Sequence, residues 1–161
     1  MLSSDHAQAR EEAAGHPALT DSVTGLPNRV HFELVYSYLF EAGDRGVAFT
    51  VMLISGGGGE ETTVGQIKEM GEVVERVTRN SDLISHIGEG RYVMLLLGTN
   101  LQGARICADR IEAALSGVAP GPTAFGLAAW TPMMKTSGDL LNAAESALLV
   151  AEAAGGGVEF G

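Results

Sequence analysis

The segment DSVTGLPNR (21–29) is the most specific string in the chain. Its residue types predict a turn that runs directly into a helix. The side chains of Asp21 and Thr24 can satisfy turn amides, and Gly25 permits a reversal of the chain. The proline–asparagine pair at 27–28 sets the start of the helix that follows.

Downstream of this segment, helical and β-type patterns alternate. Apolar residues recur at helical spacing in four segments, and five shorter segments are rich in β-forming residues. Helices are expected at residues 29–41, 64–79, 101–116 and 138–154, and strands at 47–55, 83–87, 91–97, 123–130 and 158–160. Short, mixed connections of this sort predict an α/β sandwich with helices on both faces of a central sheet.

Several elements carry more detailed expectations. The continuous apolar run at 47–55 is typical of a strand covered on both faces. Glycines at 88 and 90 predict a tight hairpin between the next two strands. The alanine-rich helix at 138–154 can pack closely on a sheet. The glycine clusters at 56–59 and 155–157 are interpreted as flexible backbone.

Composition and charge narrow the class of protein. The chain has 161 residues, the size of one domain, and a formal net charge of −10. That charge argues against a nucleic-acid binder, and no apolar run is long enough to span a membrane. The N-terminus does not resemble a secretory signal, and the single cysteine, Cys107, excludes an internal disulfide, which together indicate the cytoplasm. Residues 1–18 are expected to be an N-terminal helix or a flexible tail, and 19–161 the domain.

Five motifs in order resemble the diguanylate cyclase (GGDEF) family. The segment 21–29 resembles the family's opening D-x-L-T-G-L-x-N-R, and Arg79 to Asp82 resembles its R-x-x-D. The other three similarities are the signature turn at 88–92, the strand at 123–128 and the helix at 144–148. The match covers roughly 21–160, and it implies a GGDEF-like, nucleotide-cyclase-like α/β sandwich whose central mixed five-stranded sheet is flanked by helices.

The residues that the family uses to hold metal ions differ here. Family cyclases need two acidic ligands for divalent ions. By this resemblance, Ser55 and Gly90 stand at those two positions, and Arg91 replaces the neighbouring acid. Glu89 lies in the same turn, but one exposed glutamate without a partner is a weak divalent site. We therefore expect neither a metal nor another cofactor.

The family's nucleotide contacts are also missing. The stretch 56–63, GGGGEETT, stands in place of the guanine-reading loop. The phosphate-binding lysine and the arginine of the last helix correspond to Glu152 and Gly156. The resemblance therefore implies a domain with no catalytic residues, which is not an enzyme, although residual cyclase activity stays open as a third and weaker reading.

The family's inhibitory R-x-x-D site is retained. The resemblance assigns Arg79 and Asp82 to cyclic di-GMP binding: the arginine to phosphate or the guanine Hoogsteen edge, the aspartate to a guanine N–H donor. Arg110 occupies the place of an additional family arginine, and Arg105 lies about one position out of register with another. In the alternative interpretation these residues have only structural roles. Arg79 and Asp82 then form an i,i+3 ion pair at a helix C-terminus, and the other arginines lie on a solvated helix face.

This resemblance leaves two functions open. The first is an inactive signalling domain that binds cyclic di-GMP at the R-x-x-D site and relays it through homodimer or partner contacts. The alternative is a protein–protein interaction or dimerisation module that binds no nucleotide. Neither nucleic acid nor a membrane is an expected partner.

Overall fold

The computed structural model describes residues 17–161, so most of the segment 1–18, expected to be an N-terminal helix or a flexible tail, lies outside the described residues. The turn at 21–28 forms as expected. Asp21 Oδ2 accepts hydrogen bonds from the backbone N–H and the hydroxyl of Thr24, at 2.9 and 2.7 Å. Asn28 then caps the first long helix, because its side-chain oxygen accepts from the backbone N–H of His31 at 3.0 Å.

All four helices and all five strands expected from the sequence are present, with ends that shift by one or two residues. The helices are α2 (Arg29–Gly43), α3 (Val64–Val77), α4 (Leu101–Leu115) and α5 (Ser137–Ala153). The strands are β1 (Phe49–Ser55), β2 (Leu83–Gly88), β3 (Arg91–Leu97), β4 (Ala124–Ala129) and β5 (Gly157–Phe160). Two short 3-10 helices, η1 (Pro17–Leu19) and η2 (Gly59–Glu61), complete the described elements.

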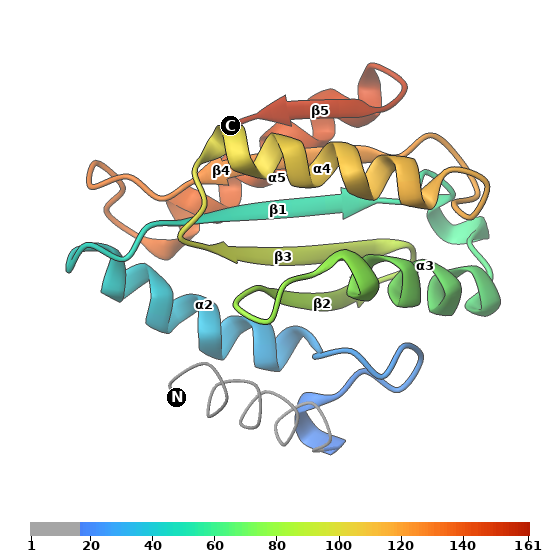
Figure 1. The fold of residues 1–161 in the computed structure, drawn as a ribbon, viewed down its shortest axis with the longest axis horizontal. Coiled ribbons are helices and arrows are strands. Elements are labelled where there is room, and N and C mark those ends of the chain that lie inside the picture. Colours follow the sequence, from blue (N-terminus) through green and yellow to red (C-terminus); the bar gives the residue numbers. More distant parts are fainter. Residues whose placement is uncertain (1–16) are drawn as a thin grey trace.

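The strands form one mixed sheet in the order β2-β3-β1-β4-β5 (Figure 1). Strand β1 lies at the centre and pairs antiparallel with both β3 and β4. Strand β5 joins the edge parallel to β4. All seven residues of β1 are buried, which confirms the prediction of a strand covered on both faces.

Helices cover both faces of this sheet, as the sequence predicts. Because side chains alternate along a strand, β1 sends Met52 and Ile54 to one face and Val51 and Leu53 to the other. The first face packs against α3 and α4, and the second against α2 and α5. The sheet is therefore the middle layer of three.

Helix α5 lies unusually close to β4. A Cβ atom on Gly126, in the middle of β4, would overlap the backbone of Ala144 and Leu148 in α5. The alanines of α5 supply the matching small side chains, and Ala144, Ala147 and Ala151 are buried. The close packing expected of this alanine-rich helix is confirmed.

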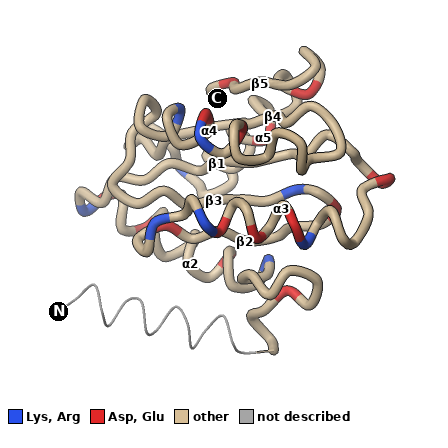
Figure 2. Tube along the Cα trace, turned by 45° about the vertical axis from the view of Figure 1, so that its right-hand side comes forward, with Lys and Arg blue, Asp and Glu red and all other residues tan. Residues whose placement is uncertain are grey.

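Charged residues lie mostly on the helices and loops (Figure 2). Strands β1, β2 and β4 carry no Asp, Glu, Lys or Arg at all. Among the described residues, no helix is both long enough and apolar enough to cross a bilayer.

Candidate functional site

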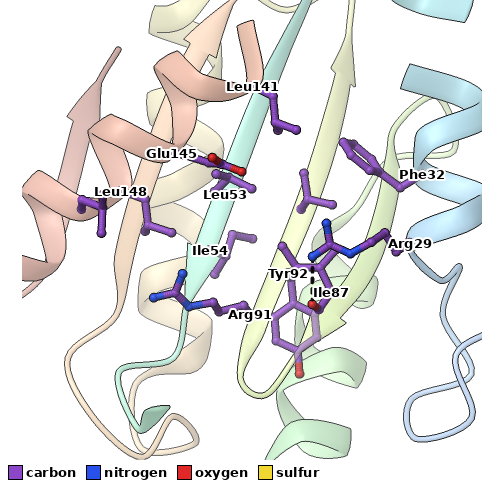
Figure 3. Close-up of a pocket in the computed structure, with 12 residues that line it drawn as sticks. Arg29, Phe32, Leu53, Ile54, Ile87, Arg91, Tyr92, Leu141, Glu145 and Leu148 are labelled. Atoms are coloured by element: carbon purple, nitrogen blue, oxygen red, sulfur yellow. Dashed lines mark hydrogen bonds between the residues drawn. The ribbon is translucent and has the colours of Figure 1, made fainter. Parts of the chain in front are cut away.

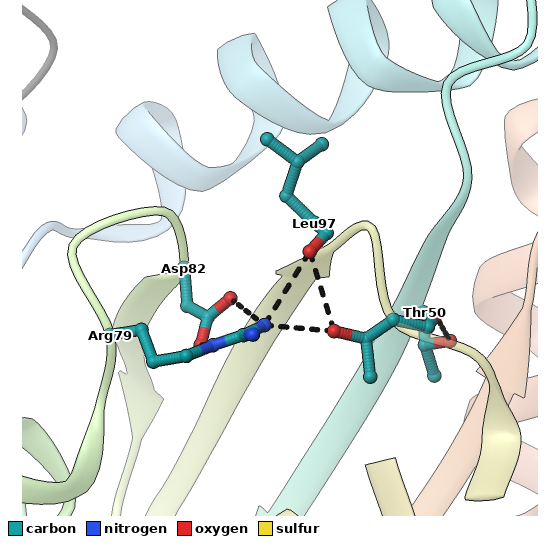
Figure 4. Close-up of polar contacts among 5 residues, drawn as sticks. Thr50, Arg79, Asp82 and Leu97 are labelled. Carbon is teal, nitrogen blue, oxygen red and sulfur yellow. Dashed lines mark hydrogen bonds and ion pairs between the residues drawn. The ribbon is translucent and has the colours of Figure 1, made fainter. Parts of the chain in front are cut away.

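The R-x-x-D pair forms a two-point ion pair between the end of α3 and the start of β2 (Figure 4). Arg79 Nε donates to Asp82 Oδ2 and Arg79 Nη2 donates to Asp82 Oδ1, both at 3.0 Å. The Asp82 side chain is 2% exposed, whereas that of Arg79 is 60% exposed. Hydrogen bonding and charge from Asp82 raise the pKa of Arg79 above its usual value. The guanidinium therefore stays charged at the surface while its carboxylate partner is buried.

A loop after β3 holds the same guanidinium. Arg79 Nη2 donates to Thr99 Oγ1 at 2.8 Å, and a longer contact of 3.5 Å reaches the carbonyl of Leu97. Thr99 is itself anchored to the central strand, because Thr50 Oγ1 donates to its carbonyl oxygen at 2.6 Å. Figure 4 shows this chain of contacts from β1 to the R-x-x-D pair.

A cavity of about 420 Å³ opens beside this pair and is walled on one side by α4. The helix contributes residues at the spacing of one helical face: Gly103, Ile106, Cys107 and Arg110. Arg79 and Asp82 also line the cavity. Arg110 is exposed, and it makes no ion pair within 4 Å with any residue that the structure describes. The cavity thus brings together three of the four residues predicted for the ligand.

Arg105, the fourth predicted residue, does not line this cavity. It precedes Arg110 by five residues, about 1.4 turns of an α-helix, so the two side chains leave α4 in different directions. Arg105 Nε instead donates to Asp109 Oδ1 at 3.3 Å, within its own helix. Arg105 therefore does not face the cavity with Arg110, and its contact with the ligand stays a prediction.

The hairpin turn and the end of β1 lie side by side, at the other end of β3. Ser55 is in register with Arg91, and the N–H of Gly56 donates to the carbonyl of Gly90 at 2.9 Å. Arg91 Nη2 donates to both carboxylate oxygens of Glu152, at 2.9 and 2.8 Å. Ser55 Oγ reaches the same carboxylate at 3.4 Å. An ion pair thus links the hairpin to α5 at this place.

These groups do not fit a divalent cation. Mg²⁺ and Ca²⁺ take several oxygen ligands, normally including carboxylates. Ser55 offers a hydroxyl, Gly90 has no side chain, and the carboxylate that reaches Ser55, on Glu152, is already paired with Arg91. No step through a metal is therefore derived at this position.

The glycine run after β1 has a specific packing role that the interpretation as flexible backbone did not include. The N–H of Gly121 donates to the carbonyl of Gly56 at 3.1 Å. A Cβ on Gly57 would overlap the backbone of Gly121 and Pro122, and one on Gly58 would come within 2.5 Å of the Pro120 ring. The lack of side chains lets two loops, at 56–58 and 120–122, pack backbone to backbone.

His86 is a contact that the sequence reasoning missed. It is buried, its Nδ1 lies 3.1 Å from Asp21 Oδ1, and its Nε2 lies 2.6 Å from the carbonyl of Glu89. This imidazole connects the opening motif to the signature turn. Because 65 positions separate Asp21 from His86, no local pattern could have revealed the pair.

A second cavity, of about 250 Å³, lies between α2 and α5 on the opposite face of the sheet from the R-x-x-D cavity (Figure 3). Leu53 and Phe32 contribute an apolar lining, and Arg29 and Glu145 stand on facing helices. Arg29 Nη2 donates to the carbonyl of Ile87 at 3.3 Å. Of the residues discussed for the family's catalytic centre, this cavity contains only Arg91.

No family model matches the sequence, and no curated protein matches it either. Solved structures do match. The coiled coil and GGDEF domain of DgcB from Caulobacter crescentus, solved in complex with c-di-GMP, is 18% identical with a TM-score of 0.78, over 99% of this chain and 92% of that one. Diguanylate cyclase SiaD from Pseudomonas aeruginosa, in complex with its activator SiaC, is 21% identical with a TM-score of 0.80, over 99% of this chain and 66% of that one.

The FimX GGDEF domain from Pseudomonas aeruginosa is 16% identical with a TM-score of 0.76, over 89% of this chain and 99% of that one. Identities this low establish the fold and leave the activity to be argued from the residues themselves. The mixed five-stranded sheet, the helices on both faces and these three similarities agree. The chain has the fold of the GGDEF domains of diguanylate cyclases.

Proposed function

We propose that this chain is a cytoplasmic signalling domain that does not synthesise cyclic di-GMP but binds it at Arg79, Asp82 and Arg110, and relays the binding through contacts with a second copy or another protein. The observation that carries the proposal is the cavity beside the R-x-x-D pair. Two guanidinium groups, from Arg79 and Arg110, line one cavity on a chain with a net charge of −10.

Two arginines at one cavity favour a ligand with phosphate groups. Guanidinium groups bind phosphate oxygens with short, charge-assisted hydrogen bonds. The cavity also exposes apolar and small residues, such as Ile106 and Gly103, against which a base can pack. A cyclic dinucleotide carries both kinds of group.

Calorimetric titration with cyclic di-GMP tests the binding. We expect a saturable heat with a micromolar dissociation constant for the wild type, and its loss in Arg79→Ala. Arg76→Ala is the matched control, because Arg76 is an exposed arginine in the last turn of α3 that does not line the cavity. If the wild type gives no heat, or if both variants bind equally well, cyclic di-GMP does not bind at this site.

The proposal that synthesis is absent rests on the hairpin. Two metal ions need acidic ligands to hold a triphosphate and activate the attacking hydroxyl. The place implied for those ligands contains Ser55, Gly90 and the ion pair between Arg91 and Glu152. Incubation of the protein with GTP and Mg²⁺ or Mn²⁺ should give no cyclic di-GMP; product formation above a GTP-only blank would overturn this part of the proposal.

A pure interaction module is the second candidate, and an exposed apolar stripe favours it. Val30, Leu34 and Tyr38 lie four residues apart on α2 and are 53%, 62% and 73% exposed. Side chains at this spacing share one face of the helix. Sedimentation of the wild type and of Leu34→Glu tests this candidate. Self-association that the variant abolishes, together with no response to cyclic di-GMP, would select it over nucleotide binding.

A further inference from the structure

We propose that the cavity between α2 and α5 is a second ligand site, which binds a free α-amino acid with an apolar side chain. The ligand's carboxylate binds Arg29, its ammonium group binds Glu145, and its side chain enters the apolar space between them. This cavity lies on the opposite face of the sheet from the R-x-x-D cavity, so the proposal is independent of cyclic di-GMP binding.

The cavity has an apolar lining and a small volume. Phe32 of α2, Leu53 of β1 and Leu148 of α5 contribute to the lining (Figure 3). Its volume of about 250 Å³ is below the range of roughly 300–1,000 Å³ that is usual for drug-sized ligands. Leu149 also lines the cavity and is 64% exposed, so a ligand that covers it removes apolar surface from water. These features favour a small ligand with one apolar group.

Arg29 supplies a positive charge with unused hydrogen-bond donors. Among the described residues, its guanidinium donates only to the carbonyl of Ile87, at 3.3 Å from Nη2, and it makes no ion pair within 4 Å. A guanidinium has five N–H donors, in a geometry that matches the two oxygens of a carboxylate. Figure 3 shows the Arg29 side chain reaching from α2 toward the cavity. A ligand carboxylate therefore has a partner here.

Glu145 supplies the opposite charge from α5. Within the part of the chain that the structure describes, its carboxylate makes no ion pair within 4 Å, so it is not paired with Arg29. Figure 3 shows Glu145 beside Leu53, across the cavity from Arg29. A carboxylate accepts short, charge-assisted hydrogen bonds from an ammonium group. A ligand amino group therefore has a partner on the opposite wall.

The remaining charged residue of the lining, Arg91, is already compensated. Its Nη2 donates to both carboxylate oxygens of Glu152, at 2.9 and 2.8 Å. One uncompensated cation and one uncompensated anion, Arg29 and Glu145, then face the cavity. A ligand with a negative charge alone would be repelled by Glu145, and one with a positive charge alone would be repelled by Arg29. A zwitterion matches both, and the apolar lining between them selects an apolar side chain.

Calorimetric titration of the whole chain with L-phenylalanine and two analogues tests the proposal. 3-Phenylpropionate keeps the ring and the carboxylate but lacks the amino group, and 2-phenylethylamine lacks the carboxylate. We expect L-phenylalanine to bind the wild type with a dissociation constant on the order of 0.1–1 mM, as suits so small a ligand. Each analogue should bind about tenfold more weakly, because one of the two charged contacts is lost. No saturable heat with L-phenylalanine, or equal affinity for either analogue, would overturn the proposal.

Two charge-neutral variants locate the site. Arg29→Gln and Glu145→Gln should each weaken L-phenylalanine binding about tenfold. Glu145→Gln should also bind 3-phenylpropionate more tightly than the wild type does, because a like charge has been removed from the cavity. A change that merely disturbed the packing of α5 would weaken both ligands. Weaker binding of both ligands by Glu145→Gln would therefore contradict the proposal.

Arg45→Gln and Glu33→Gln are the matched controls. Both residues are exposed, and neither lines the cavity, so these changes should leave the affinity for L-phenylalanine unchanged. Losses in the controls equal to those in Arg29→Gln and Glu145→Gln would overturn the proposal. Cyclic di-GMP should bind Arg29→Gln as tightly as it binds the wild type, and failure of both to bind it would refute the proposed function without touching the amino-acid site.

Discussion

Single residues decide what the hairpin end of this domain can do. Arg91 and Glu152 carry charges opposite to those that the resemblance implies at their positions, and the two side chains pair with each other. Each departure alone would disturb a site for metal and triphosphate. Together they form a local ion pair, which satisfies both side chains without a ligand.

Reversal of the charge on one side chain of the Arg91–Glu152 ion pair should destabilise the domain. Arg91→Glu places a second carboxylate beside Glu152, and we expect a loss of about 1 kcal/mol in the free energy of unfolding, because both side chains are partly exposed. The double variant Arg91→Glu/Glu152→Arg restores opposite charges and should recover most of that loss. Urea denaturation of the two single variants and the double variant measures the coupling; strictly additive losses would contradict it.

The bond between Asp21 and His86 should make stability depend on pH. Partial burial raises the pKa of Asp21, but hydrogen bonds from His86 and Thr24 outweigh it, and the pKa lies below its usual value of 3.8. A lowered carboxyl pKa stabilises the fold above the unfolded-state value, and this contribution is lost as the pH falls through the folded-state value.

Asp21→Asn tests this dependence. We expect the variant to be about 1–2 kcal/mol less stable than the wild type near neutral pH. The gap should be smaller at about pH 3, because the pH has then fallen below the unfolded-state pKa of about 3.9 toward the lower folded-state pKa. Asp44→Asn, at the exposed end of α2, serves as the control and should show no gap at either pH. If the difference in stability between Asp21→Asn and the wild type did not change with pH, titration of the Asp21 carboxyl would not be its cause.

Residue contacts were predictable from the sequence only where they are local. The bonds of Asp21 to Thr24 and of Arg79 to Asp82 span three positions and follow from turn and helix-end chemistry. The pair between Arg91 and Glu152 spans 61 positions, and Arg79 to Thr99 spans 20. Such contacts depend on the order of strands in the sheet, which residue patterns do not reveal.

At the scale of elements, the close approach of α5 to β4 is one of the tightest contacts among the described residues. The helix backbone lies directly over Gly126, where no side chain fits. This contact holds the last helix, and therefore Glu152, against the sheet. It connects the small residues of α5 to the geometry of the hairpin.

Gly126→Ala should therefore cost stability. The added Cβ overlaps the backbone of Ala144 and Leu148, so helix or strand must shift, and we expect a loss of about 1–3 kcal/mol. Gly65→Ala is the matched control, because its Cβ, in the first turn of α3, meets nothing closer than 3.9 Å. That change should be neutral or stabilising by up to about 1 kcal/mol. Thermal unfolding of the two variants compares them; similar midpoints would contradict the packing argument.

The elements themselves were predictable, but their arrangement was only partly so. Periodicity located the helices and strands within two residues, because each segment is long or strongly patterned. The packing role of the glycines at 56–58 was not predicted from the sequence, since a close backbone contact and a flexible loop favour the same residue. Arg105 does not line the cavity with Arg110, because helix register decides which face a residue occupies, and its part in ligand binding stays a prediction.

At the scale of the whole molecule, two sites lie at opposite ends of β3. The hairpin with Arg91 is at its start, and Leu97, beside Arg79, is at its end, roughly 20 Å away for a strand of this length. Changes at the first site do not reach the second through any direct contact between described residues. Loss of synthesis and retention of ligand binding are therefore compatible within one fold.

Cys107 offers the most direct measurement of the central claim. It is the only cysteine in the chain, and it lines the R-x-x-D cavity. Burial raises the pKa of its thiol, so alkylation is slow and can be followed by mass spectrometry at mildly alkaline pH. Millimolar cyclic di-GMP should slow the alkylation of the wild type several-fold and leave the rate in Arg79→Ala unchanged. An unchanged wild-type rate under the same conditions would contradict the account, because the ligand would not occupy this cavity.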